Sequence, residues 1–165
     1  MNEYRERLLG LLGKDDPLEV LAQTPGHLDR LLDGLGESGL GRSLAPGKWT
    51  ARQIFGHLCD VEQAIGFRIR QIVTSAPGHV IQPFDQDTWA APYPRLNPRD
   101  AVRAHAGMRA WNLSYYRTLT AADRSRAALH PERGEESVET TLRMHAGHDR
   151  NHLAQLEKLA ASGGS

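Results

Sequence analysis

Apolar residues recur at helical spacing in four separate stretches, and this pattern limits the folds that the chain can adopt. The stretches cover residues 17 to about 35, 50 to about 73, 98 to about 119 and 137 to about 160. Residues three and four positions apart share one face of a helix, so each stretch can bury one apolar stripe. The sequence has no strand-like alternation and no internal repeat. Four long helices, preceded by a short apolar helix at residues 2–13, predict an all-α four-helix bundle.

Local signals mark where these helices begin and break. Thr50 can accept a hydrogen bond from the backbone near Gln53, and Gln53 can reach back, which predicts a capping box. Ser137 is a favourable N-cap for the last helix. Pro25 lies inside the first long helix and predicts a kink or local break there. A polar, glycine-rich connection is expected over residues 36–47.

Residues 74–97 have neither a helical nor a strand period, and they contain four prolines. A segment of this length without regular structure is usually functional or mobile in a compact domain. It carries Phe84, Asp85, Asp87 and Trp89, which could fold over the end of the bundle. No recognisable motif in it identifies a substrate.

Length and composition exclude several classes of protein. The 165 residues predict one domain, placed at residues 1–160 with a flexible tail at 161–165. The 20 basic residues equal the 20 acidic ones, which disfavours a nucleic-acid partner. The single cysteine, Cys59, cannot form an internal disulfide and suits a reducing compartment. The sequence contains neither a long apolar span nor a signal peptide, so we expect a cytoplasmic protein without membrane contact.

Three histidines lie close together in the last predicted helix, at His145, His148 and His152. At about 100° per residue, His148 and His152 project only about 40° apart, one turn from each other. Two imidazoles at that spacing can bind one metal ion. His145 points in a similar direction, which leaves two candidate pairs, His145 with His148 and His148 with His152. Packing histidines on an ordinary amphipathic helix would give the same pattern.

His57 lies at the edge of the apolar stripe of the second long helix, as either a core histidine or a third metal ligand. Asp60 projects within about 60° of it and Arg68 within about 20°, so all three are predicted to face one cavity. There Asp60 could orient a ligand or take a proton, and Arg68 could hold an anionic group. Cys59 projects to the opposite side and is expected to pack. Asp149 projects about 100° from His148 and is expected to be solvated.

These residues resemble the DinB/YfiT-like superfamily of metalloenzymes over about residues 16–160. The match rests on an ordered set: Trp49-Thr-Ala-Arg-Gln, Gly56-His57-Leu58-Cys59-Asp60, Arg68, Trp89 and His148-x-x-x-His152. The resemblance implies a mirror variant of the up-and-down bundle. It also implies a divalent metal, nickel or zinc, held by His57, His148 and His152, with His145 beside the site or in the core. Asn151 and Gln155 differ from many relatives at positions that are not ligands.

Members of this superfamily often form dimers, and some are S-transferases that use a low-molecular-weight thiol such as bacillithiol or mycothiol. Others are described only as metal-dependent hydrolases. Three neutral imidazoles leave a coordination position open, which favours catalysis over a structural site. We therefore expect a metal-dependent enzyme acting on a small molecule, either a hydrolase or a thiol S-transferase. The alternatives are a bundle that binds a metal or small ligand without turnover, and a purely structural bundle with core histidines.

Overall fold

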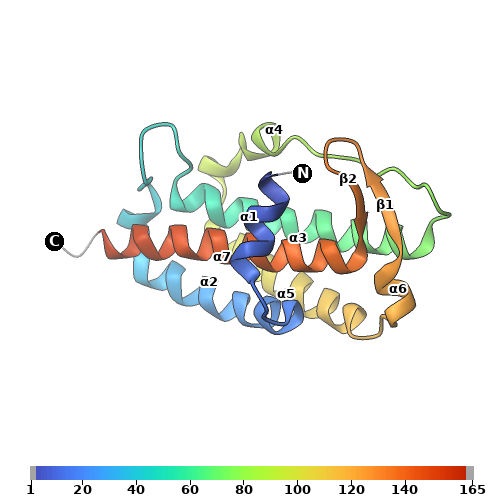
Figure 1. Ribbon diagram of the computed structural model, residues 1–165. Coiled ribbons are helices and arrows are strands. Elements are labelled where there is room, and N and C mark those ends of the chain that lie inside the picture. The colour runs from blue at the N-terminus through green and yellow to red at the C-terminus, as the bar shows by residue number, and fades with distance from the viewer. Residues whose placement is uncertain (1–2, 163–165) are drawn as a thin grey trace.

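The computed structural model describes residues 3–162, and its four long helices form a bundle (Figure 1). They are α2 (Pro17–Leu40), α3 (Ala51–Thr74), α5 (Pro98–Tyr116) and α7 (Val138–Ala161). Around the bundle, α2 packs on α7, α7 on α3, α3 on α5, and α5 on α2. The consecutive helices α2 and α3 therefore lie diagonally opposite each other, which a simple up-and-down bundle would not give. The predicted four-helix bundle is confirmed.

Short elements surround the bundle. The predicted N-terminal helix is α1 (Glu3–Leu12), which packs across α7 (Figure 1). The irregular segment at 74–97 contains the short helix α4 (Gln86–Ala90) and the single 3₁₀ turn η1 (Tyr93–Arg95). Another short helix, α6 (Ala121–Ser125), follows α5. Among residues 3–162, no helix is long and apolar enough to cross a membrane.

The helix boundaries follow the local sequence signals, but the break in α2 lies at another residue than predicted. Thr50 accepts from the Gln53 backbone while the Gln53 side chain accepts from the Thr50 N–H, so the predicted capping box starts α3. Ser137 caps α7 as predicted. In α2 the backbone leaves helical geometry at Gly36, with φ at 57°, a value that favours glycine, and not at Pro25. The helix then resumes to Leu40, so the connection to α3 is shorter than predicted.

A two-stranded antiparallel hairpin precedes α7 and corrects the prediction that the chain has no strands. It consists of β1 (Ala127–His130) and β2 (Gly134–Ser137), with Ala128 opposite Glu136. The loop before α4 pairs with it: Ile81 N–H donates to the Leu129 carbonyl over 2.9 Å. Strands of four residues are too short to display an alternating pattern. Their pairing therefore depends on tertiary contacts that the sequence pattern does not report.

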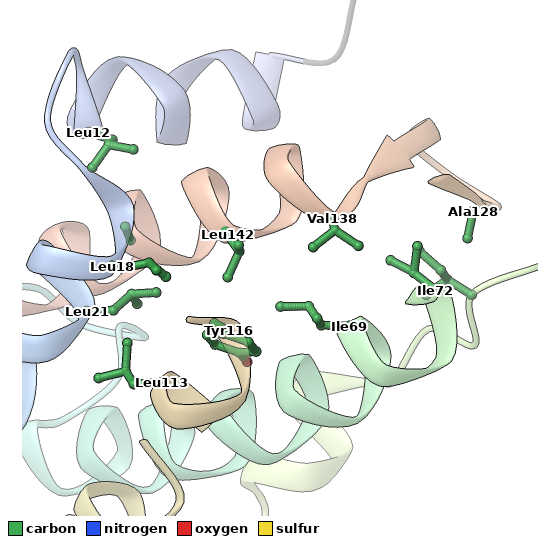
Figure 2. Packing of buried hydrophobic residues seen from close by; sticks show 12 residues of the cluster. Leu12, Leu18, Leu21, Ile69, Ile72, Leu113, Tyr116, Ala128, Val138 and Leu142 are labelled. Atoms are coloured by element: carbon green, nitrogen blue, oxygen red, sulfur yellow. The ribbon is translucent and has the colours of Figure 1, made fainter. Parts of the chain in front are cut away.

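The core of the bundle consists of two apolar clusters. One lies where the start of α2, the end of α3, the end of α5 and the start of α7 meet (Figure 2). It includes Leu18, Leu21, Ile69, Leu113, Tyr116 and Leu142. The other lies at the opposite end of the same helices and includes Leu28, Leu32, Ile54, Phe55, Leu58 and Leu156. The apolar stripes predicted from the sequence supply both clusters. On α7, His148 and His152 lie between the two clusters, whereas His57 lies within the part of α3 that supplies the second one.

The predicted tail at 161–165 is only partly within the described residues. Ala161 still belongs to α7, and residues 163–165 lie outside the described part of the chain.

Candidate metal centre

Three histidines from two facing helices come together at the side of the bundle. His57 lies on α3, and His148 and His152 lie one turn apart on α7. One ligand nitrogen from each lies within 4.8 Å of the others, and all three residues are buried. The facing helices α3 and α7 thus bring together the three histidines that the resemblance implied, and they separate this set from His145.

The donor set fits a divalent ion. His57 Nε2 and His148 Nε2 lie 3.0 Å apart. Two nitrogens bound at about 2.0–2.1 Å in a tetrahedral site would be about 3.3 Å apart, so small side-chain shifts suffice. His152 Nδ1 contacts Gln155 Oε1 at 2.9 Å, which leaves its Nε2 as the nitrogen available to an ion. The Nδ1 atoms of His57 and His148 have no partner within residues 3–162.

Burial keeps these imidazoles neutral, which is the form that binds metals. It lowers the pKa of His57 to about 3, with a further lowering from the neighbouring His152. Burial likewise lowers the pKa of His152 to about 4. For His148, burial and the two other histidines lower the pKa well below its usual value. The cluster therefore presents three uncharged donors at neutral pH.

Trp49, which precedes α3, forms one wall of the site. Its ring centroid lies 4.5 Å from that of His57 and 6.4 Å from that of His152, and the planes of Trp49 and His152 are only 18° apart. The indole therefore packs against the rings of both histidines.

Two cavities reach the histidine cluster. The larger cavity, of about 720 Å³, is lined by His57 and His148, by residues 83–86 where α4 begins, and by the hairpin. The smaller, of about 590 Å³, lies on the Trp49 side and is lined by all three histidines. Tyr4 and Leu8 of α1 line both cavities, so α1 lies over the cluster between them. Phe84 and Asp85, for which the sequence suggested a place over the end of the bundle, line the larger cavity.

The two residues predicted beside His57 have different surroundings. Arg68 lines the larger cavity and is only 7% exposed. Asp60 is not among the residues that line it, because its carboxylate accepts a hydrogen bond of 2.5 Å from the Tyr93 hydroxyl of η1. Arg68 thus shares the cavity with His57, on the helix face predicted from its azimuth. For Asp60, the hydrogen bond to Tyr93, which lies outside the four bundle helices, sets the direction of the side chain.

The bundle interior also contains a buried polar network, which the sequence did not predict. Arg109 of α5 is fully buried and donates to Glu62 over 2.7 Å and to Asp149 over 2.8 Å. His145 Nε2 lies 3.3 Å from the Arg109 guanidinium and 3.4 Å from Glu62. Thr24 completes the network by donating to Asp149 over 2.7 Å. His145 is therefore part of the bundle interior and is not grouped with the cluster of His57, His148 and His152.

The expectation that Asp149 is solvated was wrong. Asp149 is 0% exposed. Burial alone would raise the pKa of its carboxyl, but Arg109 lowers that pKa to about 2. One sequence signal could have revealed the network, namely a charged residue at a position that belongs to the apolar stripe of its helix. Glu62 follows Leu58 by one turn, and Arg109 precedes Leu113 by one turn, so both lie on buried faces.

Comparisons with known proteins agree with the fold and the cluster. Residues 21–156 match the family model described as the DinB superfamily. A protein of Oceanobacillus iheyensis with the name "Putative metal-dependent hydrolase" is 30% identical over 144 residues, covering 86% of this chain and 83% of that protein. The Bacillus subtilis protein "Putative metal-dependent hydrolase YfiT" is 25% identical over 164 residues, 97% of this chain and 92% of its own length.

Solved structures show the same fold. The crystal structure of YfiT from Bacillus subtilis, described as having an unusual four-helix bundle topology, superposes with a TM-score of 0.84 at 23% identity, covering 90% of this chain and 86% of that one. A mycothiol-dependent maleylpyruvate isomerase superposes with a TM-score of 0.69 at 19% identity, covering 94% of this chain but 63% of that one.

Proposed function

The chain belongs to the DinB superfamily, and from this premise we propose that it is a metal-dependent enzyme whose divalent ion is held by His57, His148 and His152. The observation that carries the proposal is the buried three-histidine cluster with a large cavity beside it. Imidazole donors suit zinc and nickel, which we propose as the candidate ions.

Such an ion, when bound, supplies a Lewis acid that lowers the pKa of a coordinated water or thiol toward neutrality. The protein's own residues define where that chemistry occurs. His57, His148 and His152 provide neutral donors, so the site keeps the full charge of the ion. Trp49 packs against the rings of His57 and His152 and limits their movement. Arg68 is a cation in the same cavity and can hold an anionic part of the substrate.

Asp60 has an indirect part in this proposal. Its hydrogen bond to Tyr93 ties η1 to α3, and η1 ends the segment whose earlier residues line the cavity. We therefore assign Asp60 a positioning role for that segment, in place of the direct proton transfer expected from its azimuth.

Two reactions are compatible with this site. Hydrolysis of a small-molecule ester or amide is the first candidate, because the relatives of similar length carry the name of metal-dependent hydrolases. Transfer of a low-molecular-weight thiol to an electrophile is the second. The larger cavity favours it, since about 720 Å³ can hold an organic nucleophile as well as water.

Metal content is the first test. The protein is purified without added metal and without a polyhistidine tag, and its metal stoichiometry is measured by mass spectrometry. We expect one divalent ion per chain, and its loss in His57→Ala and His148→Ala. His27→Ala is the matched control, because His27 lies on α2 outside both cavities. Full metal content in both ligand variants would refute the centre.

Turnover is the second test. Metal-loaded and metal-stripped protein are incubated with a panel of esters and amides, and separately with low-molecular-weight thiols and a chromogenic electrophile. Metal-dependent turnover in one panel identifies the reaction. Metal binding without turnover in either panel would support the alternative of a bundle that binds a metal or a small ligand without catalysis.

A further inference from the structure

Arg68 is the starting point for an inference about the shape of the substrate. It lies in α3, is only 7% exposed, and lines the same cavity as His57 and His148. Within residues 3–162 its guanidinium has no hydrogen bond or ion pair. Burial, together with the nearby Arg133, lowers its pKa, which means that the surroundings disfavour its charge. A buried cation left in this state indicates a binding position for an anion.

None of the described carboxylates that line the cavity forms an ion pair with Arg68. Glu136 is 1% exposed and already accepts two hydrogen bonds from Arg133, of 2.6 and 3.0 Å, and one from Arg5. Asp85 is exposed and caps α4 through the backbone of Asp87 and Thr88. Glu132 also lines the cavity, from an exposed position, and forms no ion pair with Arg68. Within residues 3–162, Arg68 therefore has no carboxylate partner.

The position of Arg68 on α3 sets a distance from the metal ligands. It follows His57 by 11 residues along one unbroken helix. That separation is about 16 Å along the axis and only about 20° around it. Because helical side chains lean toward the N-terminus, the guanidinium reaches back toward His57. An anion at Arg68 therefore lies about 10–16 Å from a group at the metal centre.

On the α3 side, the wall between these two ends is apolar. Val61 and Ile65 follow His57 at one-turn intervals and line the cavity between it and Arg68. Met144 of α7 and Phe84 of the irregular segment line the same cavity. Besides His148, the polar residues that line it from the opposite helix α7 are Thr141 and His145. A polar middle section packed against Val61 and Ile65 would lose hydration without gaining partners on that side.

We infer that the cavity takes an elongated substrate with its reactive group at the three histidines, an apolar middle along Val61 and Ile65, and a carboxylate at Arg68. This inference rests on the proposed metal centre and specifies the substrate class for it. The length matches about three to five residues of extended chain. A single free guanidinium fits a singly charged carboxylate in bidentate geometry, whereas a phosphate dianion would need a second free cation. Arg133 does not supply one, because Glu136 occupies it.

Hydroxamates test this inference without knowledge of the reaction, because the hydroxamate group binds divalent ions. Metal-loaded protein is titrated calorimetrically with acetohydroxamate, with monohydroxamates of linear dicarboxylic acids from succinic to dodecanedioic acid, and with alkyl hydroxamates of equal lengths. We expect the carboxylate end to tighten binding by about tenfold or more at one intermediate length, and not at the shortest. Arg68→Gln should remove this gain and Arg68→Lys most of it, while acetohydroxamate binding stays unchanged.

Arg103→Gln is the matched control, since it removes the same charge from an exposed position of α5. Its titrations should match those of the parent protein. Equal binding of carboxylate-ended and alkyl hydroxamates at every length, with acetohydroxamate still bound, would overturn this inference alone. A gain that persists in Arg68→Gln would also overturn it. Failure of acetohydroxamate to bind would overturn the metal centre and the inference with it.

Discussion

Two buried arginines of this protein differ sharply in their surroundings. Arg109 is fully buried between Glu62 and Asp149, and these carboxylates raise its pKa although burial opposes its charge. Arg68 is nearly as buried, and its pKa is lowered by burial and by Arg133. The first arginine is held by structural partners. The second keeps an unneutralised charge beside the candidate site, where a substrate could neutralise it.

This contrast predicts opposite effects on stability. Arg68→Met should raise the free energy of unfolding by about 1 kcal/mol or more, because it removes an unpaired buried charge and keeps the volume. Arg109→Met should lower it by about 3–5 kcal/mol, because it leaves two carboxylates buried without a cation. Urea unfolding followed by circular dichroism measures both. A loss of stability in Arg68→Met would mean that Arg68 has a stabilising partner and is not a vacant anion position.

His145 tests which histidines belong to the metal centre. His145→Gln should retain the metal, since His145 belongs to the network around Arg109 and not to the three-histidine cluster. It should nevertheless lower the free energy of unfolding by about 1–3 kcal/mol, because the Arg109 guanidinium and Glu62 lose a buried neighbour. Metal analysis and urea unfolding of the same preparation separate the two effects. Loss of metal from a folded His145→Gln protein would move the site one turn along α7.

At the residue scale, the sequence predicts which helix face a side chain occupies more reliably than its partner. The spacing of His148 and His152 and the azimuth of Arg68 follow from helix geometry alone. Asp60 shares that geometry, but Tyr93 of a separate segment binds it. Asp149 projects away from His148 and was taken as solvated, yet Arg109 on α5 makes burial of its charge favourable. Such pairings depend on which helices face each other, which a single sequence does not specify.

At the scale of elements, the crossing of α1 over α7 depends on one glycine. A Cβ atom at Gly147 would lie 2.0 Å from the Leu8 carbonyl oxygen, far inside any tolerated contact. Gly147 is next to His148, and Leu8 lines both cavities. The close approach of the two backbones therefore holds α1 over the histidine cluster.

Gly147→Ala should displace α1 and open the site. We expect a lower free energy of unfolding and faster removal of the metal by a chelator, because Leu8 and Tyr4 would no longer cover the cluster. Gly10→Ala is the control, since a Cβ there meets nothing within 4 Å and alanine favours the helix by about 1 kcal/mol. Chelator kinetics for Gly147→Ala equal to those of Gly10→Ala would show that α1 does not limit access to the metal.

The sequence predicted the long helices well and the hairpin not at all. The four bundle helices have apolar stripes and capping residues that act locally, so their existence and most of their ends could be predicted. The hairpin has neither signal, because Glu136 faces inward to bind Arg133 and Arg5. Its role in lining the cavity follows only from the assembled structure.

At the scale of the whole molecule, the polar network forms a layer between the two apolar clusters. On each bundle helix, a residue of the polar network lies between members of one apolar cluster and members of the other. On α2, for example, Thr24 lies between Leu21 and Leu28. Burial of ionised groups restricts how the helices can slide, since any shift in register would separate the charges. The layer therefore fixes α3 against α7, and with them the spacing of His57 from His148.

The same interior makes the metal-free protein sensitive to acid. Burial lowers the pKa values of His57, His105 and His152 to about 3, 4 and 4, against about 6.5 in an unfolded chain. Below pH 6.5 the unfolded chain therefore binds more protons than the folded protein, so stability must fall as the pH falls. Each such histidine contributes about 1.4 kcal/mol per pH unit. The carboxylates titrate lower, so the window from pH 7 to pH 5 reports on histidines.

We expect the free energy of unfolding of the metal-free protein to drop steeply between pH 7 and pH 5, by several kcal/mol in all. Because domains of this size are stable by about 5–15 kcal/mol, acid unfolding should begin near pH 5. The metal-loaded protein should remain folded to lower pH, since an ion bound only by the folded state shifts the equilibrium toward it. Urea unfolding at half-unit pH steps, with and without chelator, measures both slopes. A stability independent of pH over this window would mean that the buried histidines are already accessible to protons in the folded protein. A buried centre lined by neutral histidines would then be incorrect.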